Sequence, residues 1–191
     1  EVALINAHPQ AQSGVNNILF ITVGNQAANL TTATATQLDS INAATTQAIL
    51  IDGAIANVTG SASGLAVTYA ASNEFTNLLN ATAKVDVASQ DVSDLKSLND
   101  IVGVTIDLTS VTAITGTYDE VKEDFYDVRT DFNNFTNIAT VNVTGAVANA
   151  ANLHALKDDF RTNVKNTATF DLAGVTTITG LSFNHLNHVI A

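Results

Sequence analysis

The residues of this chain that could bind a ligand directly include three aspartates at comparable places in a recurring pattern. Asp52, Asp107 and Asp171 each stand just before a short run of β-branched and small residues. Carboxylates lying side by side would repel one another unless each accepted backbone hydrogen bonds or bound a cation. The sequence predicts local turn hydrogen bonds for all three, and calcium held through carboxylate oxygens is the alternative.

Two further groups resemble metal ligands in type but not in spacing. The acidic residues within 91–100 and 119–131 lack the alternating oxygen ligands and turn glycine of a calcium loop, which favours solvated helix faces. His185 and His188 are three residues apart, so their rings could share a helix face, but no third ligand accompanies them. We therefore predict no cofactor, with calcium as the one alternative.

Motifs for catalysis and for modification differ in what they predict. The chain contains no nucleophile elbow, phosphate-binding loop or zinc motif, so we predict that it is not an enzyme. Its Asn-x-Thr sequons begin at Asn29, Asn57, Asn80, Asn134 and Asn142, about as many as chance gives in so Asn- and Thr-rich a chain. Asn80 and Asn134 are the candidate glycosylation sites, because both are expected near helix ends.

The low charge of the chain limits its partners. Only 13% of the residues are charged and the net charge is −11, whereas ordinary globular domains carry about 25% charged residues. Nucleic acid requires a basic surface and anionic membranes attract basic residues, so both are excluded as primary partners. No apolar run reaches the roughly 18 residues of a membrane helix, which predicts no membrane insertion.

A short phrase recurs along the chain: a β-branched residue, then Thr, then Gly. The copies, including two weaker ones, end at Thr32, Gly60, Ser89, Gly116, Gly145 and Gly180. Self-similarity with a period near 28 residues is typical of repeat architectures. Before three copies, two β-branched stretches flank a small residue: Ala54, Ser110 or Gly174. Because small residues allow a bend and close backbone contact, we expect a strand, a corner and a second strand.

After each phrase the apolar spacing changes from two residues toward 3.6, which indicates a helix. The clearest helix is predicted within 117–132, with Thr117 as its N-cap and Glu120 three residues further on. Its apolar residues are Val121, Phe125, Val128 and Phe132. Similar sets follow other phrases: Leu38 and Ile41; Val92, Leu95 and Leu98; Leu153, Leu156, Phe160 and Val164; and Leu186 and Val189.

These features predict a mixed α/β repeat solenoid. Each unit of about 28 residues would hold two short β-strands and a helix, and the units would stack with parallel strands. Residues 29–191 would form five to six such units, and residues 1–28 an N-terminal strand and linker segment, since Val15–Val23 has the pattern of one apolar strand. An ordinary α/β domain with accidental Thr-Gly turns is the alternative.

Two of the phrases carry a resemblance to a known class of proteins. Asp107-Leu-Thr-Ser-Val-Thr-Ala-Ile-Thr-Gly and Asp171-Leu-Ala-Gly-Val-Thr-Thr-Ile-Thr-Gly resemble the Thr-, Ala- and Gly-rich tandem repeats of large bacterial, notably cyanobacterial, surface and secreted proteins. The resemblance covers roughly residues 29–191. It implies an extracellular location and a role in adhesion, matrix or filament formation, and it carries over no catalytic residue. The calcium-binding nonapeptide common in such proteins is missing.

The predicted function is structural. We expect an extracellular surface or filament subunit whose partners are copies of itself, joined head to tail or by strand exchange. The expected interface consists of apolar residues from both ends of the chain: Val15, Ile18, Phe20, Val23, Leu186 and Val189.

The alternative function is a carbohydrate- or surface-binding adhesin module within a longer chain, with surface glycans as partners. Its binding face would use exposed aromatic rings, for which the chain offers Tyr69, Tyr118 and Tyr126. Burial of these rings would weaken this alternative.

Overall fold

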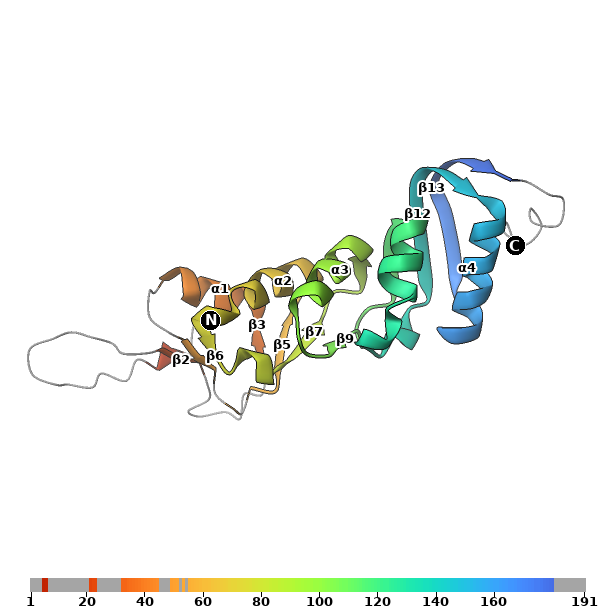
Figure 1. Ribbon diagram of the computed structural model, residues 1–191. Coiled ribbons are helices and arrows are strands. Elements are labelled where there is room, and N and C mark those ends of the chain that lie inside the picture. The colour runs from red at the N-terminus through yellow and green to blue at the C-terminus, as the bar shows by residue number, and fades with distance from the viewer. Residues whose placement is uncertain are drawn as a thin grey trace, which may run out of the picture. The chain divides into compact units, whose positions relative to one another are not determined.

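Short strands and helices alternate along the chain, in a mixed α/β arrangement (Figure 1). The computed structural model describes residues 5–6, 21–23, 32–44, 49–51, 53 and 55–180, with side chains from residue 32 onward. The strands are β1 (Ile5–Asn6), β2 (Ile21–Val23), β3 (Thr32–Thr34), β4 (Ile49–Ile51), β5 (Asn57–Gly60), β6 (Phe75–Thr76), β7 (Thr82–Val85), β8 (Ser89–Asp91), β9 (Ile106–Asp107), β10 (Ala113–Thr117), β11 (Phe132–Asn133), β12 (Thr140–Asn149) and β13 (Thr169–Thr179).

The helices are of three kinds. The α-helices are α1 (Ala35–Ala44), α2 (Ala62–Ala70), α3 (Val92–Ile101) and α4 (Ala150–Asn163). A π-helix, η3, spans Glu120–Tyr126. Single 3₁₀ turns are η1 (Ser72–Glu74), η2 (Leu78–Asn80), η4 (Arg129–Asp131) and η5 (Phe135–Asn137).

The strands form three sheets. Their strand orders are β1-β2-β4-β6, β11-β9-β7-β5-β3 and β13-β12-β10-β8. Strand β1 runs antiparallel to β2, whereas β2–β4, β4–β6, β3–β5, β5–β7, β8–β10, β10–β12 and β12–β13 are parallel pairs. Parallel neighbours need a crossover between them, and the helices after β3, β5, β10 and β12 lie in such crossovers.

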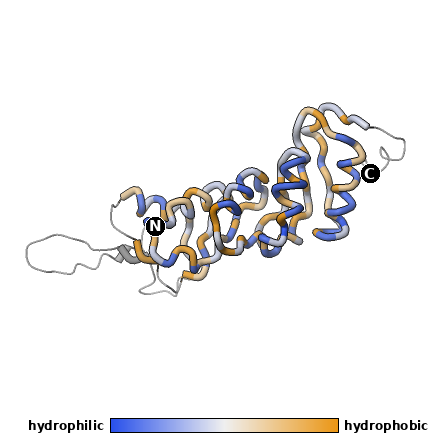
Figure 2. Tube along the Cα trace, in the orientation of Figure 1, coloured by the Kyte–Doolittle hydropathy of each residue, from blue (hydrophilic) through white to orange (hydrophobic). Residues whose placement is uncertain are grey.

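The chain divides into two compact units, each with its own core. Unit 1 comprises Glu1–Val85 and Leu98–Ile106, and unit 2 comprises Asp86–Ser97 and Asp107–Ala191. Aliphatic side chains dominate the core of unit 1, whereas the core of unit 2 contains stacked rings, with Phe125 5.4 Å from Phe132 and 6.1 Å from Phe160 between centroids. Figure 2 shows that hydrophilic residues occur along both η3 and α4.

The predicted change from strand to helix at the recurring phrases is confirmed at five of the six copies. The phrases ending at Thr32, Gly60, Ser89, Gly116 and Gly145 lie in or at the start of strands that lead into a helix. The expected inward residues are buried, among them Leu38, Ile41, Val92, Leu95, Leu98, Leu153, Leu156, Phe160 and Val164. The residues after Gly180, including Leu186 and Val189, lie outside the described part of the chain.

The predicted repeat solenoid is wrong. A solenoid with one phrase in each unit would place all the phrase strands side by side in one sheet. Instead β3 and β5 belong to one sheet, whereas β8, β10, β12 and β13 belong to another. The register also departs from the predicted period: Thr32 pairs with Asn57 rather than Gly60, and Gly145 pairs with Val175 rather than Gly180. The recurring phrase therefore predicts where a strand is followed by a helix, but it does not predict which strands pair.

The helix predicted within 117–132 is also corrected. Its N-terminus is as predicted, because the Thr117 N–H donates to Glu120 Oε2 (2.6 Å) and the Glu120 N–H donates to Thr117 Oγ1 (3.3 Å). The helix itself is η3, a π-helix, in which the Asp127 N–H donates to the Lys122 carbonyl five residues back. It ends before Val128, and Phe132 belongs to β11.

The expected corner at Gly174 is a bulge in one long strand. The register of β12 and β13 shifts between Asn142/Asp171 and Thr144/Gly174. A Cβ on Gly174 would stand 3.1 Å from Thr144 Cα, so the small residue permits the close backbone contact that the sequence predicted. The corner expected at Ala54 and most of the predicted strand Val15–Val23 lie outside the described residues, and the proposed boundary at residue 28 stays a prediction.

Candidate functional site

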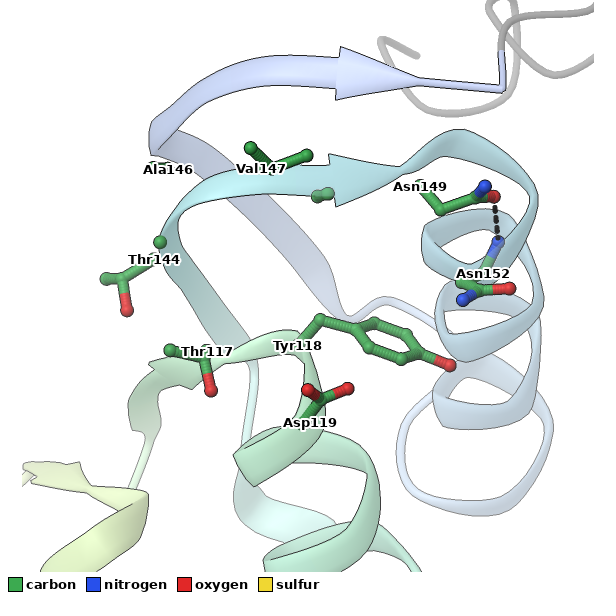
Figure 3. Close-up of a pocket in the computed structure, with 10 residues that line it drawn as sticks. Thr117, Tyr118, Asp119, Thr144, Ala146, Val147, Asn149 and Asn152 are labelled. Atoms are coloured by element: carbon green, nitrogen blue, oxygen red, sulfur yellow. Dashed lines mark hydrogen bonds between the residues drawn. The ribbon is translucent and has the colours of Figure 1, made fainter.

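A polar hollow of about 410 Å³ lies at the carboxyl ends of β10 and β12, within unit 2 (Figure 3). In open parallel sheets this end of the strands is the usual place for a ligand. The hollow is lined by residues from the end of β10, the two positions between β10 and η3, the second half of β12 and the first turn of α4: Thr117, Tyr118, Asp119, Thr144, Gly145, Ala146, Val147, Ala148, Asn149 and Asn152.

A bend in β12 gives the hollow its wall. Gly145 has φ +108°, a conformation that side chains on L-residues disfavour and glycine tolerates. Beyond this bend β12 continues to Asn149, whose side-chain Oδ1 caps α4 by accepting hydrogen bonds from the N–H groups of Ala151 (2.9 Å) and Asn152 (3.3 Å). On the other side of the hollow, the hydrogen bonds between Thr117 and Glu120 fix the start of η3. They also fix Tyr118 and Asp119, which lie between these two residues.

Tyr118 and Asp119 are the most distinctive groups of the hollow. Figure 3 shows the Tyr118 ring reaching from the start of η3 toward Asn152 on α4, with Asp119 next to it. Burial raises the pKa of the Tyr118 phenol; the positive charge of Lys122 opposes this shift, and the negative charge of Asp119 adds to it. The hydroxyl therefore keeps its proton at physiological pH and can donate a hydrogen bond.

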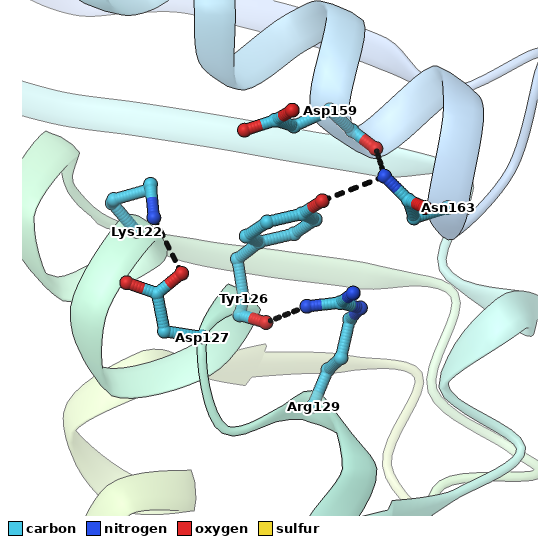
Figure 4. A network of polar contacts seen from close by, with 6 residues as sticks. All are labelled: Lys122, Tyr126, Asp127, Arg129, Asp159 and Asn163. Atoms are coloured by element: carbon cyan, nitrogen blue, oxygen red, sulfur yellow. Dashed lines mark hydrogen bonds and ion pairs between the residues drawn. The ribbon is translucent and has the colours of Figure 1, made fainter.

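The C-terminal half of η3 is held by a polar network around Tyr126 (Figure 4). The Arg129 guanidinium lies 4.2 Å from the centre of the Tyr126 ring, and its Nη1 donates to the Tyr126 carbonyl (2.7 Å). Asn163 on α4 donates to the Tyr126 hydroxyl (2.8 Å). Lys122 pairs with Asp127, and this hydrogen bond raises the pKa of Lys122. These contacts fix η3 against α4, and the residues just before η3 and in the first turn of α4 line the hollow.

The recurring aspartates make local hydrogen bonds, as predicted, where the structure describes them. Asp107 Oδ1 accepts from the Thr109 N–H (2.9 Å) and also from Asn134 Nδ2 (2.7 Å). Asp171 Oδ1 accepts from the Ala173 N–H (2.9 Å), whereas Asp52 lies outside the described residues. Within the described ranges, no group of three or more His, Asp or Glu side chains is placed to share a metal ion.

The two candidate glycosylation sites differ in how firmly their amides are held. Both are exposed and lie in 3₁₀ turns or at their margins. Asn134 has φ +61° and donates from Nδ2 to Asp107 and to Thr109 Oγ1 (2.9 Å). Asn80 Nδ2 has only a long contact of 3.5 Å to Asn77. Asn80 is therefore the more accessible amide of the pair.

The outer strand β13 is the second candidate surface. It stands at the end of its sheet and pairs with β12. The Thr176 hydroxyl donates to the Ala146 carbonyl (2.7 Å) and the Thr179 hydroxyl to the Ala148 carbonyl (3.4 Å), so these side chains help to bind β13 to β12. Along its other edge, the structure shows no strand among the residues it describes.

The structure brings few of the predicted site residues together. Val15, Ile18, Phe20, Leu186, Val189, His185 and His188 lie outside the described residues, and only the backbone of Val23 is described, in β2. Tyr69 and Tyr126 are buried, at 1% and 6% exposure, and Tyr118 alone of the three lines a hollow. The sequence analysis did not predict the hollow, because the hollow depends on the bend of β12. The sequence Thr117-Tyr118-Asp119 directly after a predicted strand could have indicated a site at the end of that strand.

No protein-family model matches this chain, and no curated protein or solved structure matches it either. Among the described residues, no helix combines the length and the apolar character needed to cross a membrane.

Proposed function

We propose that this protein is a structural, self-associating protein whose copies join by adding a strand to the edge of β13. The observation that carries the proposal is an 11-residue strand at the end of a parallel sheet. An edge strand presents unpaired N–H and C=O groups on one side, and these can pair with a strand from another chain.

The edge of β13 lacks the features that usually prevent such pairing. Monomeric proteins protect edge strands with lysine, proline, charge or very short length. Strand β13 contains no Lys, Arg or Pro, and its one charged residue, Asp171, is engaged in a local turn. The segment Gly174–Thr179 is rich in β-branched residues and uncharged, which is the composition of segments that readily add strands.

The distribution of charge favours another copy of this chain as the partner. Residues 2–38 and 172–191 contain no Asp, Glu, Lys or Arg, so nearly all of the net charge of −11 is carried by the middle of the sequence. Two copies repel each other wherever their middle regions meet. Contact through the uncharged terminal regions avoids this repulsion, and the predicted interface residues from Val15 to Val23 and at Leu186 and Val189 belong to those regions.

An extracellular or cell-surface location is part of the proposal. It rests on the small charged fraction and on the resemblance to bacterial surface repeats. The adhesin alternative loses its expected aromatic face, since Tyr69 and Tyr126 are buried.

Sedimentation velocity over a range of protein concentrations tests the proposal. The native chain should form larger species as concentration rises, and added salt should promote this because it screens the repulsion between copies. The variant Thr177→Lys puts a charge at the exposed centre of the β13 edge. It should weaken association at least about tenfold, which corresponds to about 1.4 kcal/mol.

The matched control is Thr162→Lys, which makes the same change of charge at an exposed position of α4. It should associate like the native chain. A native chain that stays monomeric at every concentration, or two lysine variants that behave alike, would overturn the proposal.

A further inference from the structure

We propose that the hollow between β10, β12 and α4 binds one neutral sugar unit. The site is separate from the β13 edge, so this inference and the proposed self-association can fail independently.

Polar side chains around the hollow are available to a ligand. Within the described part of the chain, the side chains of Tyr118, Asp119, Thr144 and Asn152 make no hydrogen bond to the protein. Together they offer hydroxyl, carboxylate and amide groups from three separate elements. Vicinal hydroxyls of a sugar suit this set, since each hydroxyl can donate to a carboxylate and accept from an amide.

The charge and the number of carboxylates around the hollow disfavour anions and Ca²⁺ as ligands. The lining contains no Lys or Arg, and Asp119 makes the hollow negative, so an anion would be repelled. A single lining carboxylate also falls short of the six to eight oxygen ligands that Ca²⁺ takes. The nearby Glu120 carboxylate is already engaged by the Thr117 N–H. A neutral, hydrogen-bonding ligand remains.

The size of the hollow and the aromatic ring at its wall also suit a sugar. A volume of about 410 Å³ lies in the range of small-molecule sites. The half-buried Tyr118 ring offers a flat apolar face, against which the C–H groups on one face of a pyranose can pack. Val147, 63% exposed, adds an apolar contact at the rim.

The site is largely formed before a ligand arrives. The capping box holds the start of η3 on one side of Tyr118 and Asp119, and the Asn149 cap holds the first turn of α4. Binding therefore needs little ordering of the protein, which favours even a small ligand.

Tyrosine NMR signals provide the test, since the chain has three Tyr and no Trp. Protein labelled with ¹³C in its tyrosine rings would be titrated with methyl β-glucoside, methyl α-mannoside, methyl β-galactoside and N-acetylglucosamine. At least one probe should shift the Tyr118 signals saturably, with a dissociation constant on the order of millimolar. The signals of the buried Tyr69 and Tyr126 should stay in place, which also verifies the fold.

Two variants test whether the sugar binds in the hollow. Because Tyr118→Ala removes the Tyr118 signals, the NMR signal of the Asn152 side-chain amide reports binding in the variants. Tyr118→Ala and Asp119→Asn should each weaken binding at least about tenfold, whereas Asp86→Asn, at an exposed position elsewhere in unit 2, should leave it unchanged. The inference is overturned if none of the four probes shifts Tyr118, if all three tyrosines shift together, or if the hollow variants bind like the Asp86→Asn control.

Discussion

Two segments of the chain share one order of secondary-structure elements, and they differ in length by one residue. Tyr69, Phe75 and Asn77 recur 57 positions later as Tyr126, Phe132 and Asn134. In each segment a strand leads into a helix, then a 3₁₀ turn, a two-residue strand, an asparagine with positive φ and a second 3₁₀ turn. Asparagine is among the non-glycine residues most often found in that left-handed region.

The strands that open the two segments are separated in sequence by one residue less than the residues that follow the helices. Gly60 lies nine residues before Tyr69, whereas Gly116 lies ten residues before Tyr126. The second segment absorbs the extra residue in the wide turn of η3, where the Asp127 N–H reaches the Lys122 carbonyl. In consequence Leu65 and Tyr69 are buried four apart in α2, and Val121 and Tyr126 five apart in η3. A π-turn has here the same role as an α-turn with one residue more.

Single-residue deletions should separate the two helices most strongly. Deleting Asp124 would give η3 the spacing of α2, so that the helix becomes α-helical with a loss of about 1 kcal/mol or less. Deleting Val67 would turn Tyr69 out of the core of unit 1 and cost about 3–5 kcal/mol. Urea unfolding measures both. Equal losses from the two deletions would contradict the account of η3.

Truncating the matched phenylalanines should have the next largest effect. Phe75 and Phe132 are both buried, and alanine at either position should cost about 3–5 kcal/mol. Phe132→Ala should be worse by about 0.5–1.5 kcal/mol, because Phe132 also stacks on Phe125. The comparison is of unfolding free energies in urea, and a larger loss for Phe75→Ala would show that the stacked rings add nothing.

The stability of the fold in alkaline solution should depend on Tyr69. Burial raises the pKa of Tyr69, whose phenol has a pKa of about 10 in the unfolded chain. The folded state therefore holds this proton more tightly, and the resulting stability is complete below about pH 10 and falls as the pH rises above it. Tyr69→Phe should reduce the loss of stability as the pH rises above about 10. Thermal unfolding at several pH values provides the measurement.

The helix caps should give the smallest effects. In α2 the Gly64 N–H donates to Ser61 Oγ (3.1 Å), whereas η3 has the reciprocal Thr117–Glu120 pair. Ser61→Ala and Glu120→Ala should each cost about 1 kcal/mol. Combining Glu120→Ala with Thr117→Ala should add little, because each change breaks the same box. Additive losses in thermal unfolding would show that the two side chains act separately.

The sequence predicted the local features of this fold better than its long-range pairing. The change from strand to helix at Gly60 or Gly116, and the capping box at Thr117, depend on neighbouring residues and were readable. Which strands share a sheet depends on packing between distant segments. The equal spacing of the phrases therefore led to the wrong prediction that all the phrase strands lie in one sheet. The π-turn accommodates one extra residue, which is recognisable in the sequence only when Tyr69 and Tyr126 are treated as equivalent positions.

The candidate site was less predictable than the fold for a physical reason. Tyr118 and Asp119 are adjacent in sequence, but the hollow exists only because β12 bends at Gly145 and because Asn149 begins α4 at a fixed place. The edge of β13 was likewise hidden, since a run of β-branched residues reads the same in a central strand and in an edge strand.

Hydrogen exchange along β13 at low and high protein concentration tests the central claim most directly. If copies join at this edge, the free-edge amides of Gly174–Thr179 should exchange fast in dilute solution and become protected at high protein concentration. The Thr162→Lys control should show the same protection as the native chain. In Thr177→Lys these amides should stay unprotected. Exchange in this segment that is independent of concentration, while the native chain still forms larger species, would contradict the claim that copies join at β13.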